Sequence, residues 1–214
     1  MMVTGKKLKL NNNHKMVIKK VYIFFLSVFF LISAVNNSYT MEPEKFVQQT
    51  VNYASEALNK DFTKEEKIKK LKNIAKNSVD IRGIGYYSLG SHRKGLSDSK
   101  KKEYLEVFEK YFLKTFASRL AEYTDPKIRV DYQKKLNDKY TMVYSVLIAT
   151  EKRPEIKIDW RIITRVPNEP LIIDVVIEGV SLAKVQKEEF NSIIQSNNGS
   201  IEALFQNLKE FVIR

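Results

Sequence analysis

Apolar residues recur at helical spacing in the stretch that follows residue 41. Residues 43–58 carry a proline at a first-turn position and then an apolar face. Thr63 and Glu66 form a capping box ahead of a second helix, and residues 80–91 contain three glycines, which predicts a loose third helix. The strongest pattern is a wide apolar stripe over residues 97–122. The sequence therefore predicts several N-terminal helices, of which the last is the longest.

The apolar period then changes from helical to alternating, after Asp125-Pro126 ends the long helix. Alternation is typical of strands, and it covers residues 128–132, 140–149, 156–163 and 171–177. Two further helices, near residues 183–195 and 200–214, close the chain. We expect an α+β fold in which a four-stranded antiparallel sheet packs against several helices. Residues 41–214 would form this single domain.

Residues 1–38 have the pattern of a cleaved signal peptide. Six lysines and no acidic residue precede an apolar run at residues 21–35. This run is shorter than the ~20 residues of a membrane span and suits a signal-peptide core. A start at Met16 would give a compact signal peptide, and an uncleaved N-terminal anchor is the alternative. The pattern predicts export.

Removal of this segment lowers the net charge of the chain. Six of the 37 basic residues and none of the 25 acidic residues lie in it, so the remainder carries +6 rather than +12. A modest positive charge suits contact with anionic lipid surfaces or acidic partner faces, and export argues against nucleic acid as a partner. The chain has no cysteine, which excludes disulfides and thiolate metal sites.

The remaining chain offers little catalytic chemistry. Its one histidine, His92, lies in a loop, where an imidazole is most often solvated. One histidine without cysteine cannot form the usual zinc sites. Motifs for a serine nucleophile, for phosphate binding and for dinucleotide binding are absent from the sequence. We expect no catalysis, no metal and no cofactor.

Three charged residues suggest a structural ion pair. Asp174 and Glu178 lie four residues apart on the last predicted strand and therefore share a face. The apolar residues of that strand alternate with them: Leu171, Ile173, Val175 and Ile177. Arg119 lies on the apolar stripe of the long helix, where an unpaired buried charge would be costly. Arg119 pairs with Asp174 or Glu178, or else its guanidinium extends to solvent.

Several sequence blocks resemble the MlaC-type periplasmic phospholipid carriers, also called toluene-tolerance proteins. The blocks are YYSLG at residues 86–90, TFASRLAEY at 115–123, IDWR at 158–161, DVVIEGVSL at 174–182 and EF at 189–190. The block at residues 174–182 is the closest match. Lys187 stands where the family often has arginine, which weakens any bidentate contact there.

The resemblance implies a periplasmic carrier of a Gram-negative cell whose sheet and helices enclose an apolar cavity for phospholipid acyl chains. It also implies two protein partners, an inner-membrane ABC transporter complex and an outer-membrane lipoprotein–porin complex. We expect a monomer. The apolar residues expected to bind lipid come from the helices and the sheet: Tyr86, Leu89, Phe108, Phe112, Tyr144, Val146, Trp160, Ile162, Val175, Ile177, Val180, Ile193 and Leu204.

Two other functions fit the same sequence. One is an exported small-ligand-binding module or enzyme on a cone-shaped sheet of the nuclear-transport-factor-like kind. The other is a structural envelope protein that needs no cavity. Polar groups that project into a cavity would favour the first of these, and the sequence offers few.

Overall fold

The computed structural model describes residues 41–151, 153–164 and 169–214, so the predicted signal peptide at residues 1–38 lies outside the described part. The helices of this part are α2 (Pro43–Ala57), α3 (Lys64–Ser78), α4 (Ile81–Leu89), the 3-10 helix η1 (Gly90–Gly95), α5 (Asp98–Leu120), α6 (Leu182–Ser196) and α7 (Ile201–Ile213). The strands are β1 (Ile128–Lys135), β2 (Tyr140–Leu147), β3 (Ile156–Thr164), β4 (Pro170–Ile177) and β5 (Val180–Ser181). The prediction of an α+β fold is confirmed.

The sheet has five strands in the order β1-β2-β3-β4-β5, so the prediction of four was wrong by one short edge strand. Glu178 and Gly179 both adopt positive φ, at 48° and 81°. This tight turn reverses the chain, and β5 pairs antiparallel with the end of β4. Ser181 then caps α6 by accepting a hydrogen bond from the backbone N–H of Lys184. One short segment therefore ends the sheet and starts the next helix.

A bulge in β4 changes which of its side chains share a face. Arg161 pairs with Asp174, whereas the next residue, Ile162, pairs with Ile172, which leaves Ile173 as the extra residue. Ile172 and Val175 consequently pack into the same cluster although they are three residues apart. The expected alternation of Ile173 with Asp174 along an unbroken strand was wrong for this reason.

The strand register also separates residues that were expected to act together. Val143, not Tyr144, lies opposite Trp160, and Tyr144 lies opposite Asp159. Because side chains alternate along a strand, Tyr144 and Val146 face away from the side that carries Trp160. Tyr144 instead stacks on Tyr132 of β1, with ring centroids 4.5 Å apart.

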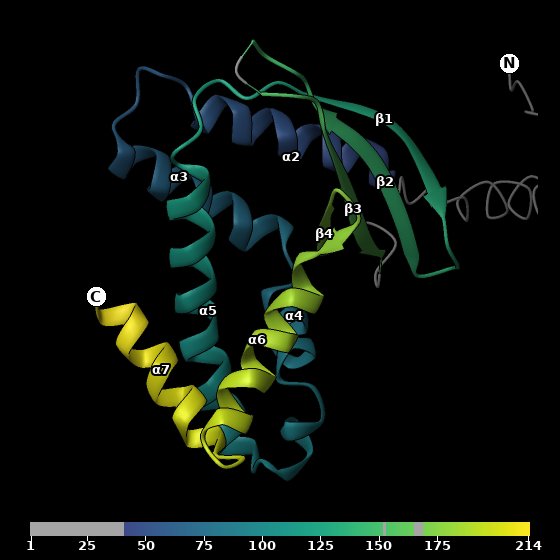
Figure 1. The fold of residues 1–214 in the computed structure, drawn as a ribbon. Coiled ribbons are helices and arrows are strands. Elements are labelled where there is room, and N and C mark those ends of the chain that lie inside the picture. Colours follow the sequence, from purple (N-terminus) through teal and green to yellow (C-terminus); the bar gives the residue numbers. More distant parts are fainter. Residues whose placement is uncertain (1–40, 152, 165–168) are drawn as a thin grey trace, which may run out of the picture. The chain divides into compact units, whose positions relative to one another are not determined.

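Helix α2 packs on one side of the sheet, as Figure 1 shows, and Trp160 belongs to the cluster between them. The buried residues of this sheet cluster are Val47, Val51, Val143, Ile162 and Ile172. The indole Nε1 of Trp160 donates a 2.9 Å hydrogen bond to Ser145 Oγ, which itself donates to the backbone oxygen of Ile158 at 2.7 Å. The polar end of the indole is thereby satisfied within the sheet.

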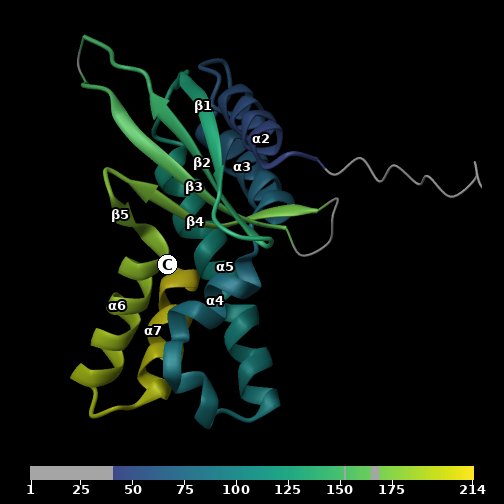
Figure 2. The same ribbon diagram turned by 90° about the vertical axis from the view of Figure 1, so that its right-hand side faces the viewer.

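Helices α4, α5, α6 and α7 form a bundle next to the sheet (Figure 2). The side chains of Tyr104, Phe108, Phe190 and Leu204 are completely or almost completely buried in it. Gly85 allows α4 to approach α5, because a Cβ at this position would lie 2.8 Å from Phe108 Cδ1. Within the described residues these side chains fill the bundle, and the expected enclosed apolar cavity is not seen.

Candidate functional site

An open pocket of about 410 Å³ lies between α5, α6 and α7, and we call it the α5–α6–α7 pocket. Each helix contributes residues at helical spacing, so each presents one face to the pocket. The lining residues are Tyr111, Lys114, Thr115, Ser118 and Arg119 from α5, Glu189, Phe190 and Ile193 from α6, and Asn207, Leu208 and Phe211 from α7.

The floor of the pocket is apolar and aromatic. Phe190 and Leu208 are buried and belong to the core of the bundle. Tyr111 contacts the rings of Phe190 and Phe211, with centroid distances of 5.8 and 5.1 Å, and also that of Phe108 at 6.3 Å. The pocket therefore continues the hydrophobic core outward, and an apolar group that entered it would remove further apolar surface from water.

The polar groups of the pocket lie on its walls. The hydroxyl of Tyr111 donates to Gln186 Oε1 at 3.3 Å. Burial raises the pKa of Tyr111 and the charge of Glu189 raises it further, whereas the hydrogen bond to Gln186 and the charge of Arg119 oppose this shift. Tyr111 is therefore a neutral phenol at physiological pH. It can donate a hydrogen bond without bringing a charge to the apolar floor.

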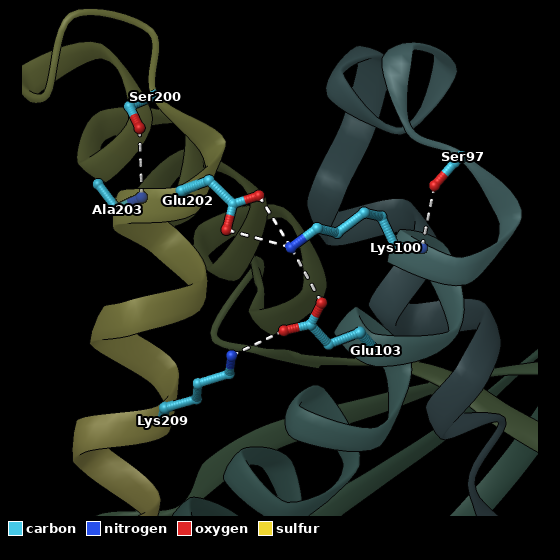
Figure 3. Close-up of polar contacts among 7 residues, drawn as sticks. All are labelled: Ser97, Lys100, Glu103, Ser200, Glu202, Ala203 and Lys209. Carbon is cyan, nitrogen blue, oxygen red and sulfur yellow. Dashed lines mark hydrogen bonds and ion pairs between the residues drawn. The ribbon is translucent and has the colours of Figure 1, made fainter.

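Polar contacts attach the α7 wall to α5. Lys114 Nζ donates to the backbone oxygens of Phe211 and Val212, at 3.0 and 3.3 Å, near the C-terminal end of α7. Two residues before Phe211, Lys209 Nζ lies 2.7 Å from Glu103 Oε1, whereas Glu202 lies in the first turn of α7 (Figure 3). In the same network Lys100 pairs with Glu103 at 3.0 Å and with Glu202 at 3.1 Å. The two helices are thus joined at both ends of the wall.

The α6 wall is attached to the sheet by Asp174. Its buried carboxylate accepts hydrogen bonds from Ser181 Oγ at 2.6 Å and from the backbone N–H of Ala183 at 3.0 Å. Arg161 Nη1, on the neighbouring strand, lies 3.4 Å from the same carboxylate. The positive end of the helix dipole also stabilises a carboxylate at the N-terminus of a helix. Asp174 therefore fixes the start of α6.

An apolar stripe on α6 leads from the sheet toward the pocket. Leu182 and Val185 are 46% and 45% exposed. They are four to seven residues before Glu189, so they lie on the helix face that lines the pocket. Exposed large apolar side chains in a row mark a surface that apolar ligands or partners contact.

Comparison with known proteins identifies the family of the chain. The family model described as MlaC protein matches residues 44–210. The chain belongs to the MlaC family. The family resemblance found in the sequence is thus confirmed, and none of the curated proteins searched matches.

Among solved structures, this chain is similar to a phospholipid-binding protein from Ralstonia solanacearum, which was solved in complex with a phospholipid. The TM-score is 0.67 at 17% sequence identity, and the match covers 81% of this chain and 98% of that chain. At this identity the likeness shows a common fold.

The residues expected to bind lipid are distributed over several places in this MlaC-family chain. Leu89, Phe108 and Leu204 are buried in the bundle, and Phe112 and Ile193 pack against it. The sheet cluster holds Trp160, Ile162 and Val175. The others lie elsewhere: Ile177 opposite Ile158, Val180 exposed on β5, Tyr144 and Val146 on the other sheet face, and Tyr86 in a groove between α4 and α5. Of the whole set, only Ile193 lines the α5–α6–α7 pocket.

The three charged residues do not form the expected ion pair in the described part of the chain. Asp174 pairs with Arg161, because the strand register places these two residues opposite each other. Glu178 Oε1 accepts a 2.6 Å hydrogen bond from the backbone N–H of Lys157. Arg119 instead lines the α5–α6–α7 pocket.

Sequence reasoning did not select most of the pocket residues. Tyr111 and Arg119 stand eight residues apart on the stripe of the long helix, which was the available signal for α5. Asn207 and Phe211 have a matching four-residue spacing on α7. Which faces of three distant helices meet depends on tertiary packing, so the pocket itself had no sequence signature.

The described residues carry two further negative findings. No group of His, Asp or Glu side chains among them could hold a metal ion. None of the described helices is long and apolar enough to cross a membrane.

Proposed function

We propose that this chain binds a phospholipid by its acyl chains in the α5–α6–α7 pocket and carries it through the periplasm. The observation that supports this most directly is the amphiphilic character of the pocket. Its floor is formed by Phe190, Leu208 and Phe211, and its walls carry Arg119 and other hydrogen-bonding side chains. An amphiphile has the same division into an apolar part and a polar part.

Family membership and the fold agree with lipid binding. The similar Ralstonia protein was solved with a phospholipid bound, and this chain shares its fold. Both observations point to a binding protein rather than an enzyme. The carrier would serve an inner-membrane ABC transporter complex and an outer-membrane lipoprotein–porin complex, and it would act as a monomer after removal of residues 1–38.

A carrier is needed because acyl chains do not cross water freely. Each buried methylene is worth about 0.8 kcal/mol, so two chains of about 15 methylenes would lose roughly 24 kcal/mol of burial in water. A pocket of about 410 Å³ is near the lower end of the range for drug-sized ligands. A two-chain lipid therefore requires the helices around the pocket to separate, and its chains would then contact the surrounding bundle residues.

The full chain, purified as the cell processes it, should contain a phospholipid at about one molecule per chain. Native mass spectrometry and organic extraction measure this directly. Delipidated protein should take labelled phospholipid from donor vesicles and deliver it to acceptor vesicles. Protein that neither contains nor takes up phospholipid would contradict the proposal. A smaller ligand in its place would favour the small-ligand-binding alternative.

A further inference from the structure

The α5 face of the pocket becomes more polar toward its C-terminal end. Tyr111 contacts the apolar floor, whereas Ser118 and Arg119 lie two turns further along the helix. The pocket thus has a donor-bearing end and an apolar end on a single helix face. A lipid whose tails occupy the apolar end would bring the first polar atoms of its head group toward Arg119.

Of the two cations that line the pocket, Arg119 is the one whose N–H donors are available to a ligand. Lys114, the other cation in the lining, donates to two backbone oxygens of α7. Glu189, the acidic residue of the lining, accepts a 3.0 Å hydrogen bond from Gln186 Nε2. Within the described residues the exposed side chain of Arg119 forms no hydrogen bond or ion pair.

The chemistry of these groups suits a phosphate. A guanidinium offers a planar fork of N–H donors that matches two oxygens of a phosphate, and such charge-assisted bonds are stronger than neutral ones. Ser118, which also lines the pocket next to Arg119, adds a hydroxyl donor. The lining contains two cations and one acid, so its charge is complementary to an anion.

We propose that Arg119 binds the phosphate of the carried lipid, so that the pocket selects phosphate-bearing lipids over neutral lipids with the same acyl chains. This inference rests on the proposed function and adds the group by which the head is recognised. It assigns specificity to one side chain at the polar end of the pocket. The acyl chains supply affinity and do not distinguish between these lipids.

The test compares phosphatidylglycerol with diacylglycerol of identical chains, by displacement of a fluorescent fatty-acid probe from the full chain as the cell processes it. Arg119→Gln should weaken phosphatidylglycerol binding about tenfold and leave diacylglycerol binding unchanged, because only the first lipid has the charge-assisted contact. Arg82→Gln is the matched control, since Arg82 lines the groove between α4 and α5. It should change neither affinity. Thermal melting of both variants should match the parent protein.

Three results separate the possible failures. Equal weakening of both lipids by Arg119→Gln, or of neither, would overturn the role of Arg119 and leave lipid carriage intact. A parent protein that binds neither lipid would overturn both proposals. Glycerol 3-phosphate, which has the phosphate without the tails, should not displace the probe at millimolar concentration. Arg119-dependent binding of glycerol 3-phosphate would show a site for small anions and would overturn the lipid assignment.

Discussion

The α5–α6–α7 pocket and the α4–α5 groove lie beside the same helix and differ in chemistry more than in size. Their volumes are about 410 and 520 Å³. The described lining of the groove is largely charged, and consists of Ile81, Arg82, Tyr86, Asp98, Lys101, Lys102, Leu105, Glu106 and Glu109. The lining of the pocket has an aromatic and aliphatic floor instead. The larger space is therefore the poorer candidate for an apolar ligand.

The difference in lining chemistry follows from the helices that face α5 in each space. The pocket is closed by α6 and α7, whose apolar faces bury Phe190, Leu204 and Leu208. The groove is bordered by α4 and by the first turns of α5, where Lys101 pairs with Asp98 at 3.1 Å in contact with solvent. Volume alone does not identify the site of an apolar ligand; a contiguous apolar floor does.

The largest expected effect is on stability, and it concerns Asp174, which attaches the α6 wall of the pocket to the sheet. Asp174→Ala should lower the free energy of unfolding by about 3 kcal/mol, because it removes a buried carboxylate that accepts from Ser181, Ala183 and Arg161. Urea unfolding followed by circular dichroism measures this. Asp98→Ala, in the groove, removes only an exposed ion pair and should cost less than about 0.5 kcal/mol. Similar losses for both variants would contradict a special role for Asp174.

A charge placed in each space tests the comparison directly. Ile193→Asp should weaken phospholipid binding about a hundredfold, because a carboxylate beside the apolar floor must be desolvated when acyl chains enter. Leu105→Asp puts the same charge into the groove and should change binding by less than about twofold. Both parent residues are partly buried against the same cluster, so they are matched. The comparison fails if Leu105→Asp is the more damaging variant in a vesicle-loading assay.

The smallest expected effect concerns the exposed network between α5 and α7. Contacts with Lys209 first and Lys100 second lower the pKa of Glu103. A lowered pKa in the folded state stabilises the protein above the unfolded value of about 4.3 and loses that contribution as the pH falls through the folded value. The parent protein should therefore melt slightly above Glu103→Gln at pH 7, and the difference should shrink as the pH falls below the unfolded value. A difference that grows on acidification would contradict this.

Local features of the fold were predictable from sequence because they depend on neighbouring residues. Thr63 and Glu66 form both hydrogen bonds of the expected capping box. The predicted long helix over residues 97–122 corresponds to α5 within two residues at its end. Spacing and capping chemistry act within a few turns, so one sequence is sufficient to read them.

Long-range pairing was not predictable in the same way. The bulge at Ile173 decides that Asp174 meets Arg161, and it depends on how β3 and β4 align over their whole length. The predicted ion pair between Arg119 and Asp174 was wrong for this reason. The pocket similarly requires α5, α6 and α7 to place Tyr111, Phe190 and Phe211 together, although these residues come from separate parts of the chain.

The position of the single tryptophan has a practical consequence for spectroscopy. Trp160 is the one indole of the chain, and it lies in the sheet cluster under α2 rather than in the lining of the α5–α6–α7 pocket. The aromatic groups of the pocket are a tyrosine and phenylalanines. Excitation near the red edge of protein absorption selects Trp160 over the tyrosines and therefore reports on the integrity of the sheet. Ligand entry into the pocket should leave this emission unchanged, so Trp160 separates unfolding from binding without an added label.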